Sequence, residues 1–298
     1  TVHVRDNPVL VVEGSISSMP VIAHLGVGSA GHKAIQRHAH GFGIVEHADL
    51  PASIRSIVPS RLPSNDSHGD VLLQSRLPGS NLSLKQMSEV EFRNYVERTL
   101  QLVLGMRPTC RHTAQGPDQE FIHEKLLPIP ELLPPELGQY LGLGRDLLKR
   151  WPSRRALPAG LVHGDLWLSN VLFDEFGRPS GLVDWEWSRD QGLPAYDALY
   201  LILMAISERR GVGINTCIPA IWDKSMRDEW LDAMLQKVSE TFGLTSEDLT
   251  RIAILVWFGT IRRSAIDTTG TSSGWLESMI CPVADRLRRY MSGLAAVH

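Results

Sequence analysis

The densest group of polar residues in this chain lies in the segment 161–184. It contains His163-Gly-Asp165-Leu-Trp-Leu-Ser-Asn170, a turn-forming Asp-Glu-Phe-Gly-Arg-Pro run, and Gly-Leu-Val-Asp184. Chance would place the pattern His-x-Asp-x-x-x-x-Asn only about 0.01 times in a chain of this composition. Short apolar runs on both sides of the turn predict a strand–turn–strand hairpin. We therefore expect one loop to carry Asp165 and Asn170, and the hairpin to end at Asp184.

These three side chains suit the transfer of a phosphoryl group to a hydroxyl, and their spacing is that of a kinase catalytic loop. The acceptor hydroxyl must be oriented and must lose its proton late, which suits the carboxylate of Asp165. Magnesium prefers hard oxygen ligands, which Asn170 and Asp184 can supply. The structural alternative is a capped loop, in which Asp165 caps a turn and Asn170 satisfies backbone groups.

Four segments together resemble the aminoglycoside phosphotransferase and choline kinase family. They are residues 163–172, 181–186 and 194–197, and the run Val-Leu-Leu-Gln-Ser-Arg-Leu-Pro-Gly at 71–79, which is similar to the strand that links the two lobes in that family. The resemblance implies an α+β, bilobal, protein-kinase-like fold with a small β-rich N-lobe and a larger, mainly helical C-lobe. It also implies ATP between the lobes, Mg²⁺, and an acceptor bound by the helical lobe.

The resemblance also implies roles for the matching positions. Asp165 would be the catalytic base, and Asn170 and Asp184 would hold Mg²⁺. Asp197 would support the loop without being a ligand. The segment that would meet the adenine through its backbone consists of Ser75, Arg76 and Leu77.

The N-terminal part departs from the family pattern, in which a strand lysine pairs with a helix glutamate to fix the phosphates. The best strand candidate, Pro-Val-Ile-Ala23-His24-Leu, offers no lysine, and Lys33 follows only after three glycines. The expected glutamate position falls near Arg37 or His38. Either Lys33 or His24 meets the nucleotide, or nucleotide binding is weakened, or the chain is a pseudokinase-like binding module. The last of these is the alternative to an ATP-dependent kinase.

A second reading of the N-terminal part is a dinucleotide-binding motif. The run Gly26-Val-Gly-Ser-Ala-Gly31 matches G-x-G-x-x-G between a predicted strand and a predicted helix. A Rossmann unit needs a second parallel strand that ends in an acidic residue about 20 positions further on. The sequence offers no such strand, so we expect a plain turn, and an NAD(P)-dependent enzyme is the weaker alternative.

The histidines are concentrated near the start of the chain, with seven of the eleven in the first 70 residues. His38, His40 and His47 suggest a metal site. However, positions 38 and 40 face different sides of a helix, and neither a cysteine nor a paired acid completes a ligand set. The sequence therefore favours solvated histidines.

Hydrophobic periodicity and turn signals predict the remaining elements and two domains. A nucleotide-clamping lobe would span 1–77, and a catalytic and acceptor-binding lobe 78–298. Ser83 and Gln86 match a capping box for a helix that ends near residue 105. The expected strands are 9–12, 20–25, 71–77, 161–163, 170–173 and 181–184, and the other expected helices are 32–47, 134–151, 196–209, 226–242, 246–266 and 275–292.

Composition excludes some classes of partner. The 298 residues carry a formal charge of −3, which argues against binding nucleic acid by bulk charge and against a polybasic membrane anchor. No apolar run approaches the ~20 residues that span a bilayer. Three scattered cysteines and no visible signal peptide favour the cytoplasm.

The expected partner is a hydroxyl acceptor, either a small molecule such as an aminoglycoside-like sugar or a peptide Ser/Thr. The oligomeric state cannot be read from the sequence.

Overall fold

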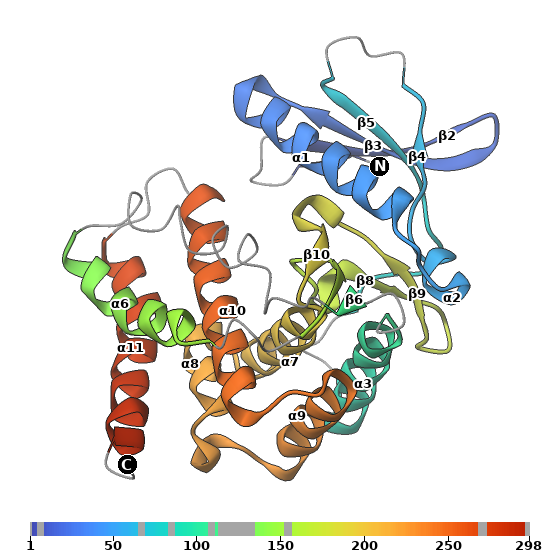
Figure 1. The fold of residues 1–298 in the computed structure, drawn as a ribbon. Coiled ribbons are helices and arrows are strands. Elements are labelled where there is room, and N and C mark those ends of the chain that lie inside the picture. The colour runs from blue at the N-terminus through green and yellow to red at the C-terminus, as the bar shows by residue number, and fades with distance from the viewer. Residues whose placement is uncertain are drawn as a thin grey trace. The chain divides into compact units, whose positions relative to one another are not determined.

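The computed structural model describes residues 2–4, 9–64, 69–82, 87–106, 111–112, 135–151, 157–267 and 273–295. Figure 1 shows their helices and strands. The chain forms two compact units. The first unit joins residues 1–109 to 160–190, and the second joins 110–159 to 191–298.

The first unit contains an antiparallel sheet in the order β1-β2-β3-β5-β4 (Figure 1). Its strands are β1 (Val2–Val4), β2 (Val9–Ile16), β3 (Met19–Gly26), β4 (Arg61–Leu62) and β5 (Val71–Ser75). Ser17 and Ser18 join β2 to β3, and both have positive φ, as a tight two-residue hairpin requires. The antiparallel pairing of β3 with both neighbours confirms that the glycine run 26–31 is not part of a Rossmann unit.

Helix α1 (Gly28–His47) covers this sheet. Its apolar stripe packs with the sheet in a small core of Val9, Ala34, Ile35, Phe42 and Leu72. The short helix α2 (Ala52–Arg55) follows, and Arg55 donates hydrogen bonds to the carbonyls of Val45 and Ala48. The amphipathic spacing of α1 decides which of its faces meets the sheet.

A second group of elements in this unit carries the motif region. β7 (Pro158–Val162) leads to the 3₁₀ turn η3 (Leu168–Asn170), the hairpin β8 (Val171–Phe173) and β9 (Pro179–Leu182), and the 3₁₀ turn η4 (Trp185–Trp187). α3 (Glu89–Gly105) packs on the hairpin through Tyr95 and Phe173, whose ring centroids are 4.9 Å apart. The predicted strand–turn–strand is confirmed.

The predicted start of α3 is wrong. Ser83 and Gln86 lie outside the described residues, and the helix begins at Glu89 with a capping box formed by Ser88 and Glu91. Both pairs match the S-x-x-E/Q pattern, and Glu89 in the first turn adds a favourable charge at the helix N-terminus.

The second unit is mainly helical. Its helices are α6 (Pro135–Lys149), α7 (Pro194–Arg210), α8 (Ile214–Cys217), α9 (Glu229–Phe242), α10 (Ser246–Asp267) and α11 (Ser273–Ala295), with the 3₁₀ turns η5 (Ile218–Ile221) and η6 (Lys224–Met226). β6 (Arg111–His112) pairs with the first residues of β7, and β10 (Arg189–Gly192) precedes α7. α7 and α10 are buried almost all round, so the apolar runs predicted as buried helices are the core of this unit.

The elements agree with the predicted fold class: a small strand-rich N-terminal region and a mostly helical C-terminal part. The predicted division at residue 77 lies inside the first compact unit, because α1 packs directly against η4. The division into lobes at 77 remains a prediction. Among the described residues, no helix is long and apolar enough to cross a membrane.

Candidate active site

The loop after β7 is held by two close backbone contacts. Nε2 of His163 donates to the carbonyl of Val183 at 2.9 Å, and the imidazole packs on Trp185 with ring centroids 4.5 Å apart. Gly164 has φ +80°, and a Cβ at this position would lie 2.1 Å from the carbonyl oxygen of Trp187. The motif glycine is therefore required both by its backbone conformation and by the closeness of the next segment.

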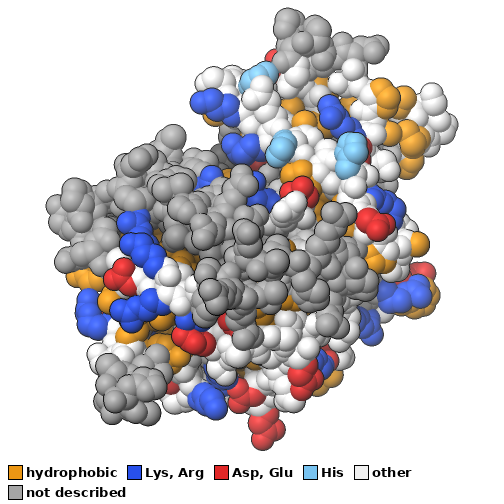
Figure 2. Space-filling model, in the orientation of Figure 1, with side chains coloured by type: hydrophobic (Ala, Val, Ile, Leu, Met, Phe, Trp, Pro, Cys, Tyr) orange, Lys and Arg blue, Asp and Glu red, His pale blue; other side chains and the backbone are white. Residues whose placement is uncertain are grey.

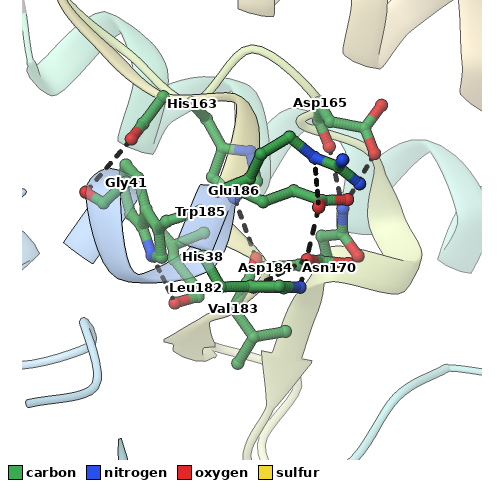
Figure 3. A network of polar contacts seen from close by, with 12 residues as sticks. His38, Gly41, His163, Asp165, Asn170, Leu182, Val183, Asp184, Trp185 and Glu186 are labelled. Atoms are coloured by element: carbon green, nitrogen blue, oxygen red, sulfur yellow. Dashed lines mark hydrogen bonds and ion pairs between the residues drawn. The ribbon is translucent and has the colours of Figure 1, made fainter. Parts of the chain in front are cut away.

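Asp165 and Asn170 are directly joined, as Figure 3 shows. Nδ2 of Asn170 donates to the backbone carbonyl of Asp165 at 2.8 Å and lies 3.5 Å from the Oδ2 atom of the Asp165 carboxylate. Asn170 is buried, at 6% exposed. Because its amide NH₂ is used inside the loop, its Oδ1 atom is the part that can serve a ligand.

Asp184 reaches the same place from the end of the hairpin. The backbone N–H of Val183 donates to the carbonyl of Asn170 at 3.0 Å, which fastens the hairpin end to the loop. Asp184 itself is left-handed, with φ 69° and ψ 57°. Such a conformation costs a non-glycine residue about 1–3 kcal/mol and is concentrated at functional sites. Its Oδ1 atom is buried and has no hydrogen-bond partner among the described residues.

A histidine of α1 completes this network. Nδ1 of His38 lies 3.8 Å from Oδ1 of Asp184, and its Nε2 lies 3.7 Å from Oε2 of Glu186. Arg37 approaches the same Glu186 oxygen at 3.5 Å. His38 is only 8% exposed, so the prediction that it is solvated is wrong. Because residues 34, 35, 38, 42 and 45 form the buried stripe of α1, the helical period was the signal that could have placed His38 inside.

The other two histidines of that cluster behave as predicted. His40 and His47 are exposed, and Nδ1 of His47 approaches the carbonyl of Gly43 at 2.7 Å. Figure 2 shows histidine side chains at the molecular surface. Among the described residues, the group that could hold a metal ion is instead His38, Asp184 and Glu186, whose candidate ligand atoms all lie within 4.8 Å of one another.

His24 and Lys33, the two candidates for the missing lysine, are in different environments. His24 on β3 faces the site, and its ring centroid lies 5.2 Å from that of His38. Lys33 is exposed on α1 and does not line the cavity. A pair of imidazoles, His24 and His38, thus occupies the region where the family pattern predicts a lysine–glutamate ion pair.

A cavity of about 590 Å³ lies beside these groups within the first unit. Asn170 and Asp184 line it, together with His24 and His38. Asp165 does not line the cavity, but Nδ2 of the lining residue Asn170 lies 3.5 Å from its Oδ2 atom. Apolar side chains of the sheet and of the hairpin form much of the remaining wall: Val9, Val11, Ile22, Leu172 and Val183.

The segment predicted to meet the adenine lies partly at this cavity. Arg76 and Leu77 line it, whereas Ser75 does not. The backbone N–H of Ser75 donates to the carbonyl of Ser60, and that of Arg76 donates to the carbonyl of Pro20. Of the three backbone N–H groups, that of Leu77 therefore remains the candidate for a ligand contact.

Comparison with family models gives a match to the phosphotransferase enzyme family over residues 33–237. A comparison with curated protein sequences gives no match.

Solved structures show the same fold at low sequence identity. A thermostable mutant of the aminoglycoside phosphotransferase APH(4)-Ia, in a ternary complex with ADP and hygromycin B, matches with a TM-score of 0.60 and 13% identity, covering 97% of this chain and 92% of that chain. Choline kinase LicA from Streptococcus pneumoniae matches with a TM-score of 0.53 and 11% identity, covering 97% and 90%. This chain belongs to the phosphotransferase enzyme family and has its protein-kinase-like fold.

Proposed function

We propose that this chain transfers the γ-phosphate of ATP to a hydroxyl group of a small molecule. The observation that carries the proposal is the meeting of Asp165, Asn170 and Asp184 at one edge of a nucleotide-sized cavity. A carboxylate beside two oxygen ligands is the arrangement that phosphoryl transfer needs.

In this proposal Asp165 is the general base. Its carboxylate orients the acceptor hydroxyl and accepts its proton, while the acceptor oxygen bonds to the γ-phosphorus and the bond to the β–γ bridging oxygen breaks. Asn170 holds the Asp165 backbone through its 2.8 Å hydrogen bond. His163 is a positioning residue, because it ties the loop to Val183 and does not line the cavity.

Mg²⁺ would be held by Asp184 and Asn170. The fit rests on the buried Oδ1 atom of Asp184, which has no hydrogen-bond partner among the described residues, and on the oxygen that Asn170 keeps free of its own bond to Asp165. Both are hard oxygen donors, which suit Mg²⁺. When bound, the ion would neutralise negative charge on the phosphates.

The nucleotide would occupy the cavity, with its base between the apolar side chains and its phosphates toward Asp184. His24 is then the residue nearest to the role of the missing lysine. Lys33 has no part in this proposal, because its side chain is exposed outside the cavity.

A small-molecule acceptor is supported by the relatives. One solved structure holds an aminoglycoside with ADP, and another is a choline kinase. A peptide Ser/Thr acceptor is the competing class, and a screen of amino sugars, amino alcohols and Ser/Thr peptides for acceptor-dependent ADP release separates the two.

The test of the mechanism is the Asp165→Asn variant. We expect it to lower acceptor-dependent ADP release by at least about 100-fold, since general-base catalysis contributes roughly 10²–10⁴-fold. Glu175→Gln, which removes an exposed carboxylate from the turn of the same hairpin, is the matched control. Equal turnover of the two variants would refute the role of Asp165, provided that both unfold at the wild-type temperature.

The His24–His38 pair favours a second candidate, a pseudokinase-like module that binds a partner without transferring phosphate. A thermal-shift titration distinguishes the candidates, because a ligand that binds only the native state must raise its stability. A rise in the unfolding midpoint with millimolar MgATP supports the enzyme. No rise at that concentration supports the binding module.

A further inference from the structure

His38, Asp184 and Glu186 bring one nitrogen ligand and two oxygen ligands to the same place. One candidate ligand atom from each side chain lies within 4.8 Å of the other two. His38 comes from the buried stripe of α1, Asp184 is the N-cap of η4, and Glu186 lies inside that turn. Figure 3 shows the three side chains gathered at this point. Imidazole and carboxylate groups are the ligand types of a divalent transition-metal site.

The contacts inside this group are longer than hydrogen bonds. Nδ1 of His38 lies 3.8 Å from Oδ1 of Asp184, and its Nε2 lies 3.7 Å from Oε2 of Glu186, whereas an N–H···O bond spans about 2.7–3.2 Å. The Oδ1 atom of Asp184 is buried, and no residue in the described part of the chain donates a hydrogen bond to it. A buried carboxylate oxygen without a partner is costly, and a bound cation would supply the missing interaction.

The spacing and the position of the group suit an ion of the size of Zn²⁺. Ligand atoms at about 2.0–2.2 Å from Zn²⁺ lie roughly 3.3–3.5 Å apart in a tetrahedron, so side-chain rotation has to bring the three atoms closer by at most about 1.5 Å. All three side chains line the cavity described above, which gives an ion a path to them. Three protein ligands leave the fourth position open to water or to a ligand in the cavity.

His38 decides which ion this group prefers. Mg²⁺ takes hard oxygen ligands in near-octahedral geometry, whereas Zn²⁺ and its neighbours among the transition metals bind imidazole nitrogen. The proposed Mg²⁺ site uses Asn170 and Asp184 and needs no nitrogen ligand. Because Asp184 belongs to both sets of ligands, the two ions compete for its carboxylate.

We propose that His38, Asp184 and Glu186 bind Zn²⁺ or a similar transition-metal ion, and that this ion inhibits the chain by withholding Asp184 from Mg²⁺. The binding of the ion stands on the geometry of the three side chains. The inhibition rests on the proposed function, which needs Asp184 for Mg²⁺. Nε of Arg37 lies 3.5 Å from Oε2 of Glu186 and opposes an incoming cation, so the two carboxylates have to outweigh this charge.

The test titrates Zn²⁺ into the full chain by calorimetry, without nucleotide. We expect His38→Gln to weaken the tightest Zn²⁺ site at least about 100-fold, because even the loss of an outer-shell partner costs about 10–100-fold. His40→Gln removes an exposed histidine from the same helix and should keep the wild-type affinity. Equal Zn²⁺ affinity of the two variants would overturn the inference and assign the binding to surface histidines.

Two further measurements do not depend on the folding of His38→Gln. Glu186→Gln removes a ligand from η4 instead of α1, and it should also weaken the site. In the unaltered protein, Co²⁺ should replace Zn²⁺ and show the visible absorption of a nitrogen-bound ion with four or five ligands. The spectrum of an octahedral ion with oxygen ligands alone would contradict the inference.

Acceptor-dependent ADP release tests the inhibition. Zn²⁺ should inhibit the wild type, added Mg²⁺ should relieve the inhibition, and His38→Gln should lose it relative to its own turnover without Zn²⁺. Inhibition that persists in His38→Gln would overturn the competition for Asp184. If Zn²⁺ binds as expected but MgATP does not bind, the proposed function fails and the metal site stands. If MgATP is turned over while His38→Gln keeps the wild-type Zn²⁺ affinity, only the inference fails.

Discussion

The contact between α1 and the 3₁₀ turn η4 makes a sharp prediction for two glycines of this helix. Gly41 and Gly43 both lie inside α1, where replacement of glycine by alanine ordinarily stabilises a helix by up to about 1 kcal/mol. A Cβ on Gly41 would lie only 2.0 Å from the backbone oxygen of Trp185, whereas a Cβ on Gly43 would meet nothing within 4 Å. The two variants thus share the gain in helix propensity and differ only in the clash.

The size of the difference follows from that clash. Oxygen–carbon contacts shorter than 3.0 Å are essentially not tolerated, so α1 and η4 would have to separate by more than 1 Å. Overpacking of this kind costs about 1–3 kcal/mol, and the obstacle here is backbone, which favours the upper end. Since 1 kcal/mol shifts the midpoint by about 2–4 °C in a chain of this size, Gly41→Ala should unfold about 6–12 °C below Gly43→Ala.

Thermal unfolding followed by circular dichroism measures this difference. Gly43→Ala should unfold at or slightly above the wild-type temperature. The hydrogen bond from Ser188 to the carbonyl of Gly41, at 3.2 Å, should be lost in Gly41→Ala, and nucleotide binding should weaken because η4 carries Asp184 at its N-cap. If both alanine variants unfold at the same temperature, the close approach of α1 to η4 is wrong.

Three further predictions concern pH, a buried hydrogen bond and metal. Burial raises the pKa of Glu208 from 4.5 to about 7. The folded state therefore favours the protonated form, and the unfolding midpoint should fall as the pH rises from 4.5 to 7, a slope that Glu208→Gln should remove. Trp151→Phe deletes the 3.1 Å hydrogen bond to buried Asp248 and should cost about 1–3 kcal/mol in urea unfolding. A change below about 0.5 kcal/mol would contradict a stabilising role for that hydrogen bond. Chelation of Mg²⁺ by EDTA should abolish the stabilisation by ADP, and Asp184→Asn should lose that Mg²⁺-dependent part even without EDTA.

The motif region was predictable because most of its structure is local. Asp174 accepts hydrogen bonds from the backbone N–H groups of Phe176 and Arg178 and thereby turns the hairpin. These contacts hold the pKa of Asp174 below its usual range, chiefly through the Arg178 backbone N–H. Because the hairpin is short and its turn is specified within five residues, Asp184 must return close to Asn170.

The start of α3 shows where local patterns stop being sufficient. Ser83-Leu-Lys-Gln86 and Ser88-Glu-Val-Glu91 both match a capping box, and a window of a few residues cannot rank them. The second pair is the one that caps the helix. The choice depends on how the helix packs against the hairpin, through contacts such as Tyr95 with Phe173, which are distant in sequence.

The contacts in the N-terminal half of the site could not be predicted from local patterns, because they join residues that are distant in the sequence. His38 meets carboxylates that lie almost 150 positions further along the chain, and Lys33, five residues earlier on the same helix, is exposed. The helical period of α1 places position 38 on its buried stripe, but the groups that His38 meets there come from η4 and the residue before it, which no pattern within the helix indicates.

The sequence by itself determined that Asp165, Asn170 and Asp184 lie close together, since their spacing is carried by one loop and one hairpin. It also determined the fold class, through the order of strands and helices. Only the tertiary structure decided what lies opposite these residues: His38 beside Asp184, with His24 next to it, where the family pattern predicts an ion pair. The physical reason is that the role of a polar side chain is set by what lies opposite it, and strand pairing and helix packing bring those opposite groups from far along the chain.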